Sequence, residues 1–126
     1  MKVSICGTEA AQGSVLQLER MIRVAIPEHS IGTCSRIEDL PHSLGSGAGI
    51  AVMVAADESE LRQFIALREE LDDVRVILVL PGDELAMVVE AQKLRPRFMA
   101  FSESNFHLVG MVLRKMVAAF AHPSLD

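Results

Sequence analysis

The feature that most constrains the fold is an apolar run at residues 74–80, Val-Arg-Val-Ile-Leu-Val-Leu, which is closed by Pro81-Gly82. Six of its seven residues are apolar, most of them β-branched or leucine, and polar residues do not alternate with them. In a strand with one solvent-exposed face, apolar and polar residues alternate, whereas a continuous apolar run is typical of a strand buried on both faces of a parallel sheet. We therefore predict a central strand here.

Four further segments indicate strands of the same sheet. Residues 49–56 form a second continuous apolar run, and residues 2–6 and 98–101 form shorter ones. Residues 29–34 are apolar only at alternate positions, which suits a sheet edge. Helical patterns separate all five segments, and strands alternating with helices predict an α/β fold. Right-handed crossovers then favour a doubly wound, five-stranded parallel sheet in the order 2-1-3-4-5, with helices on both faces.

Capping residues predict where several helices begin. Thr8 and Asp83 each precede an amphipathic segment and are predicted N-caps. Residues 35–38 and 57–60 have the spacing of a capping box, in which the first side chain accepts from the backbone of the fourth residue and the fourth reaches back.

Composition excludes several functional classes. At 126 residues we expect a single domain over 1–126. No apolar run approaches the roughly 18 residues that span a bilayer, which predicts a soluble cytoplasmic protein without a membrane partner. The net charge is −5, Lys and Arg do not cluster, and the aromatic residues are five Phe without Trp or Tyr. Nucleic-acid binding is therefore not expected.

In element order, element length and hydrophobic pattern, the whole chain resembles a response-regulator receiver domain, the flavodoxin-like module of bacterial two-component systems and phosphorelays. The resemblance implies an acidic pair after strand one, a phosphoacceptor Asp ending strand three, a Ser or Thr ending strand four and a Lys ending strand five. This chain departs at each position. After strand one it has Cys6, Gly7 and Thr8, with Glu9 as the nearby acid. Val54 stands at the phosphoacceptor position, strand four ends in Leu80, and strand five ends in Ala100, Phe101 and Ser102 without a Lys.

These departures remove the groups that phosphoryl transfer needs. Phosphoryl transfer to a carboxylate needs a divalent cation, which carboxylates, water and phosphate usually hold. A pocket formed by Val54, Leu80 and Phe101, with Ser102 in place of the Lys, supplies no such set of ligands. We interpret the chain as a pseudo-receiver: a non-enzymatic signalling or scaffold domain without metal or cofactor that acts through protein–protein interaction, independently of phosphorylation. Similar atypical receiver-like domains are partner-binding modules, including at the front of pilus-assembly localisation ATPases.

A divergent phosphorylatable receiver is one alternative. A register shift of three residues would place Asp57 beside Glu9 as a displaced phosphoacceptor, and Glu103 could join them in a weak cation site. Capping by Asp57 and Glu60 needs no shift, and acids near helix N-termini are favoured by the helix dipole in any case.

A small-molecule or phosphoryl-carrier domain is the other alternative. It would use the crevice between strands one and three, with Cys6 as a thiolate near a helix N-terminus. The carboxylate of Glu9 nearby disfavours a phosphoryl group there, and a small buried apolar thiol is the other interpretation of Cys6. Cys6 and Cys34 match neither a metal cluster nor a secreted disulfide framework, so both are expected to be reduced.

The last helix carries more apolar surface than one core face requires. An amphipathic helix usually shows an apolar arc of about 100°, which the segment after Ser104 exceeds. In receivers, helix four, strand five and helix five form the usual dimerisation and output surface. We therefore expect a protein partner or a homodimer through helices four and five, unless the extra arc is internal. The residues assigned to this face are Leu85, Met87, Ala91, Leu108, Met111 and Val112.

Overall fold

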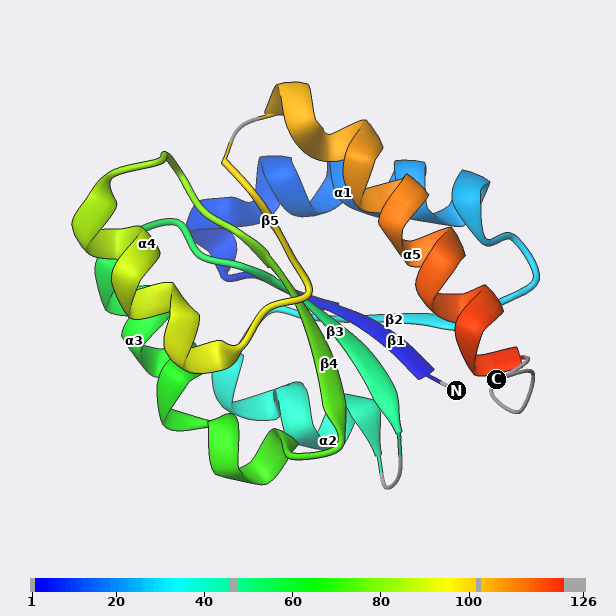
Figure 1. Cartoon of the computed structure of the whole chain (residues 1–126), viewed down its shortest axis with the longest axis horizontal. Helices are drawn as coiled ribbons and strands as arrows, with labels where there is room; N and C mark the ends of the chain where they lie inside the picture. The colour runs from blue at the N-terminus through cyan, green and yellow to red at the C-terminus, as the bar shows by residue number, and fades with distance from the viewer. Residues whose placement is uncertain (1, 46–47, 102, 122–126) are drawn as a thin grey trace.

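Five parallel strands form the centre of the molecule (Figure 1). The computed structural model describes residues 2–45, 48–101 and 103–121. The sheet order is β2-β1-β3-β4-β5, which confirms the predicted doubly wound topology. The run at 74–80 forms β4, an inner strand beside the central β3. The strands are β1 (Lys2–Cys6), β2 (Ile31–Cys34), β3 (Gly49–Val54), β4 (Val74–Val79) and β5 (Phe98–Ala100).

Helices cover both faces of the sheet (Figure 1). The first face carries α1 (Gln12–Ala25) and α5 (Phe106–Ala121), and the second carries α2 (Leu40–Leu44), α3 (Glu58–Ala66) and α4 (Leu85–Ala91). Short 3-10 turns precede or extend these helices: η1 (Glu9–Ala11), η2 (Ile37–Asp39), η3 (Arg68–Leu71), η4 (Gln92–Leu94) and η5 (Glu103–Asn105).

The two helical layers explain why the inner strands do not alternate in polarity. Successive strand residues point to opposite faces, so Val52 enters the core under α1 and α5 whereas Met53 enters the core under α2, α3 and α4. All six residues of β3 are buried. β2 lies at one edge, as its weaker pattern predicted, although it begins at Ile31 rather than His29.

Among the cap positions at Thr8, Ser35, Asp57 and Asp83, only Asp57 caps its helix as expected. The Asp57 side chain accepts a hydrogen bond from the Glu60 backbone N–H at 2.9 Å and caps α3. The capping box at 35–38 is not formed, because Pro41 fixes the start of α2 five residues later. Asp83 lies one residue before the actual N-cap of α4, which is Glu84. Thr8 precedes η1 without a side-chain cap.

In the part of the chain that the structure describes, no helix is both long enough and apolar enough to cross a membrane.

Candidate functional site

The crevice of interest lies at the carboxyl edge of the sheet, above the ends of β3 and β4. Parallel α/β sheets bind ligands at this edge. A cavity of about 260 Å³ is present there, and it brings together the predicted residues Val54, Leu80 and Phe101. Ser102 lies outside the described residues. The remaining lining is mostly apolar: Ala10, Ala11, Ala55, Ala56, Val79, Pro81 and Phe106, with Ser14 and Glu103 as the polar side chains.

Gly7 occupies the position directly after β1, where the receiver resemblance implies an acidic pair. A Cβ atom on Gly7 would lie 2.5 Å from Val15 Cγ2 and 3.2 Å from Val54 Cβ. Contacts this short cannot form without movement of the neighbours. The space that a carboxylate would need at Gly7 is therefore filled by Val15 and Val54.

The predicted acids do not gather into one site. Asp57 and Glu9 are exposed and neither lines the cavity, whereas Glu103 does. The Asp57 carboxylate is used as the α3 cap. Within 2–45, 48–101 and 103–121, no group of three or more His, Cys, Asp or Glu side chains is placed to share a metal ion. In this structure, therefore, these three acids do not form a ready-made cation site.

A buried carboxylate links the loops on either side of the crevice. Glu60, only 9% exposed, accepts a hydrogen bond from the Ala56 backbone N–H at 2.9 Å and another from the Thr8 hydroxyl. The capping-box prediction expected Glu60 to reach back to Asp57, and it instead reaches Ala56 and crosses to the β1–α1 connection. Local spacing carried no signal for this link, because Thr8 and Glu60 are 52 residues apart.

The two cysteines lie side by side on neighbouring strands. Cys6 on β1 is in register with Cys34 on β2, the edge strand. Cys6 is completely buried in the core of the second face, and Cys34 is half-buried against the same core. The Cys6 thiol donates to the Arg36 carbonyl oxygen, with 3.6 Å between Sγ and O. The sequence predicted two separate reduced thiols and missed this pairing.

The two thiols shift each other's pKa in opposite directions. Contact with the Cys6 thiol lowers the pKa of Cys34, burial opposes this, and Ser4 adds to the lowering while the charge of Asp39 works against it. The same contact with Cys34 raises the pKa of Cys6, and burial raises it further. The pair therefore ionises first at Cys34. A raised pKa and full burial of Cys6 argue against the phosphoryl-carrier alternative, which needs a thiolate at Cys6.

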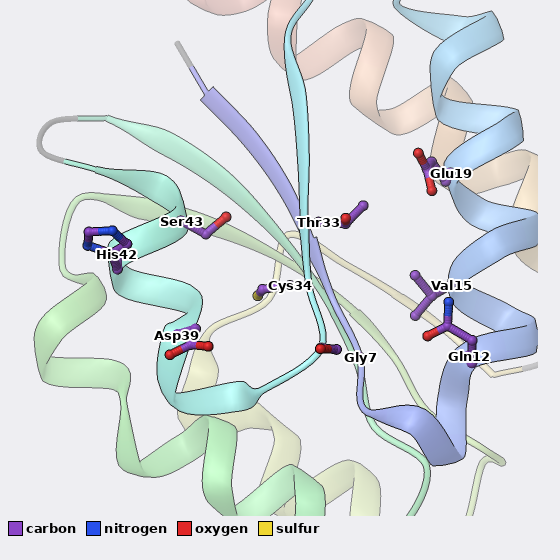
Figure 2. A pocket seen from close by; sticks show the side chains of 10 residues that line it. Gly7, Gln12, Val15, Glu19, Thr33, Cys34, Asp39, His42 and Ser43 are labelled. Atoms are coloured by element: carbon purple, nitrogen blue, oxygen red, sulfur yellow. The ribbon is translucent and has the colours of Figure 1, made fainter.

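A pocket of about 620 Å³ surrounds the edge of the sheet at β2 and includes Cys34 (Figure 2). Side chains of α1, among them Gln12 and Glu19, lie on one side of β2, and side chains of η2 and α2, among them Asp39 and His42, lie on the other. Figure 2 shows the Cys34 side chain pointing to the α2 side.

The residues of the predicted interaction face differ in exposure. Leu85 is 78% exposed and Met111 is 55% exposed, but Ala91, on the inner side of α4, is completely buried and cannot contact a partner. Met87, Leu108 and Val112 are half-buried. Val89, one turn after Leu85, is 59% exposed and was missed, although its i, i+4 spacing from Leu85 could have revealed it.

Part of the broad apolar arc of α5 is internal. A Cβ atom on Gly110 would lie 3.3 Å from the Cβ of Ala25, so this glycine allows α5 and α1 to approach closely. Val109 and Leu113 are completely buried on the same helix. Because α5 contacts both the sheet and α1, its apolar arc must be wider than one core face. Of the three α5 residues assigned to the interaction face, only Met111 is largely exposed.

No family model matches the sequence, and no curated protein matches it. Among solved structures, the chain is similar to the crystal structure of a response regulator receiver domain from Rhodospirillum rubrum, with a TM-score of 0.69 and 12% sequence identity. The match covers 94% of each chain. At this identity the likeness establishes a receiver-like fold, and function has to be argued from the residues themselves.

Proposed function

We propose that this chain is a pseudo-receiver: a non-enzymatic signalling or scaffold domain that acts in the cytoplasm by binding a protein partner, without phosphorylation. The receiver-like fold supports a signalling role in general terms. The more specific proposal depends on the crevice at the carboxyl edge of the sheet and on the outer face of α4.

The observation that carries the proposal is the largely apolar lining of the crevice. Val15 and Val54 occupy the space beside Gly7, and Leu80 closes the end of β4. A transferring phosphoryl group carries several anionic oxygens, which need a cation and hydrogen-bond donors around them. Val54 and Leu80 offer neither, and Asp57 is engaged in capping. The fold is therefore better suited to presenting a surface than to accepting a phosphoryl group.

The surface that we assign to the partner is the outer face of α4, together with Met111 on α5. Leu85 and Val89 lie one helical turn apart, so they form one apolar strip. Burying a Leu or Val side chain contributes about 1.5–3 kcal/mol, so two such residues form an effective centre for an interface. Edge strand β5 lies between α4 and α5 in Figure 1, so the strip and Met111 flank one edge of the sheet.

Site-specific photo-crosslinking tests this surface. A benzophenone amino acid is placed at Val89, at Met111 or, as a control, at Val24, an 81% exposed valine on α1. Because α1 covers the other face of the sheet from α4, we expect a discrete adduct from position 89 and none from position 24. The proposed interface spans the β5 edge, so position 111 should also give an adduct although α5 lies in the same layer as α1 (Figure 1). The mass of the adduct distinguishes a homodimer from a different protein partner.

A paired substitution provides the second test. Leu85→Glu with Val89→Lys removes the apolar strip and introduces a favourable i, i+4 ion pair, so α4 should remain folded. In this background the crosslink from position 111 should be lost, whereas in a Val24→Lys background it should persist. An unchanged crosslink in the α4 variant, or the absence of any discrete adduct at position 89, would refute the proposed face.

A further inference from the structure

The two cysteines lie close enough on neighbouring strands to react with each other, which is unrelated to the partner surface on α4. Cys6 and Cys34 are register partners in adjacent parallel strands, and both side chains belong to the second face of the sheet. Neighbouring strands lie about 4.8 Å apart, which falls within the range of Cα separations of about 4.4–6.8 Å found in disulfides. The two sulfur atoms can therefore be joined after a small adjustment.

The adjustment is easiest on the β2 side. β2 is an edge strand of four residues that pairs with β1 alone, so it can shift without breaking a second ladder. β1 lies between β2 and β3 and is held on both sides.

The two thiols also differ in access. Cys34 lines the pocket of about 620 Å³ at the sheet edge, whereas Cys6 is completely buried and does not line it. A solute can therefore reach Cys34 first. Contact with the Cys6 thiol lowers the pKa of Cys34, which favours a thiolate at the accessible position. Reactive sensor cysteines combine an accessible thiolate with a second, resolving cysteine beside it.

We propose that Cys34 and Cys6 form a peroxide-oxidisable pair, with Cys34 as the attacking thiol and Cys6 as the resolving thiol. In the first step, the Cys34 thiolate attacks a hydroperoxide oxygen, the O–O bond breaks, sulfur is oxidised to sulfenic acid and the leaving oxygen departs as hydroxide or alkoxide. In the second step, the Cys6 sulfur attacks the Cys34 sulfur, water leaves with the Cys6 proton, and a disulfide forms. The disulfide fixes β2 to β1.

Hydrogen peroxide and dimedone, which traps sulfenic acids, test the proposal by mass spectrometry. In the wild-type protein we expect an intramolecular disulfide and the loss of both free thiols. Cys6→Ala should accumulate the sulfenic acid of Cys34 and give a dimedone adduct there, because the resolving thiol is gone. Cys34→Ser should lose both products. Iodoacetamide should alkylate Cys34 at least about tenfold faster than Cys6 in the folded protein.

Circular dichroism of each variant verifies that it is folded, and Cys6→Ser serves as a second resolving-thiol variant if Cys6→Ala is not. Two free thiols in the wild-type protein after peroxide treatment would refute the proposal. So would the absence of a dimedone adduct at Cys34 in a folded Cys6 variant, or a disulfide that forms only between two molecules.

Discussion

Gly7 determines which side chains can fit beside the crevice. Val15 occupies the space that a side chain at position 7 would need. A Cβ atom built on Gly7 would lie 2.5 Å from Val15 Cγ2. Replacing the glycine with any larger residue must displace Val15 or Val54, both of which are buried in the core of the first face. An acid therefore cannot be introduced at position 7 without rearranging this core.

We expect Gly7→Ala to destabilise the protein by about 1–3 kcal/mol, because the added methyl overpacks this core. Gly13→Ala is the matched control: it lies in α1 with no atom within 4 Å of its Cβ position. That variant should gain about 0.5–1 kcal/mol from helix propensity. Urea unfolding followed by far-UV circular dichroism measures both, since the chain has no Trp or Tyr for fluorescence. Equal stability of Gly7→Ala and the wild type would mean that Val15 moves aside at no cost.

Among the elements, α3 is linked to the β1–α1 connection by the buried Glu60 carboxylate. Thr8 donates to one carboxylate oxygen and the Ala56 N–H donates to the other. The two loops that flank the crevice are thereby held by hydrogen bonds within the protein. This link ties the β1–α1 connection to the start of α3.

A double-mutant cycle on Thr8 and Glu60 measures the link. Thr8→Val keeps the shape but removes the donor, and should cost about 1.5–3 kcal/mol, the range for a hydrogen bond to a charged group. Glu60→Ala also leaves the Ala56 N–H without its acceptor and should cost more. The two should couple by about 1–2 kcal/mol.

Arg62→Ala is the control on the same helix. Its ion pair with Glu58 is exposed, so its loss should cost at most about 0.5 kcal/mol. Additive effects of Thr8→Val and Glu60→Ala would contradict a direct link between the two side chains.

For the whole molecule, the question is whether the receiver-like fold retains any response to phosphorylation. In this chain, the carboxyl edge of the sheet carries an apolar cavity, while the largest exposed apolar side chains lie outside it, on α1, α4 and α5.

We expect Mg²⁺ followed by beryllofluoride, an acyl-phosphate mimic, to cause no saturable shift in backbone amide NMR signals around Glu9, Val54 and Asp57. The reason is that these residues present no converging carboxylates to a cation. Asp57→Asn should behave identically and remain folded, because Asn also caps helices. Saturable shifts clustered at Glu9 and Asp57, abolished by Asp57→Asn, would instead establish a divergent phosphorylatable receiver.

The sequence by itself determined the features that depend on local order along the chain. The continuous apolar runs predicted a parallel sheet, their alternation with helical patterns predicted its order, and Asp57 was recognised as a cap. The same local argument failed at the starts of α2 and α4, which begin at Leu40 and Leu85. Periodicity and caps act over a few residues, so they predict elements better than they predict exact ends.

Only the tertiary structure decided how the elements meet. It placed Thr8 on Glu60, Cys6 beside Cys34, and Val15 in the space beside Gly7. It also buried Ala91 while leaving Leu85 and Val89 exposed. Each of these contacts joins segments from different parts of the chain, and their existence depends on the packing of both helical layers against one sheet. A pattern read along the chain contains no information on which distant side chain fills a given space, because that is determined when the layers pack together.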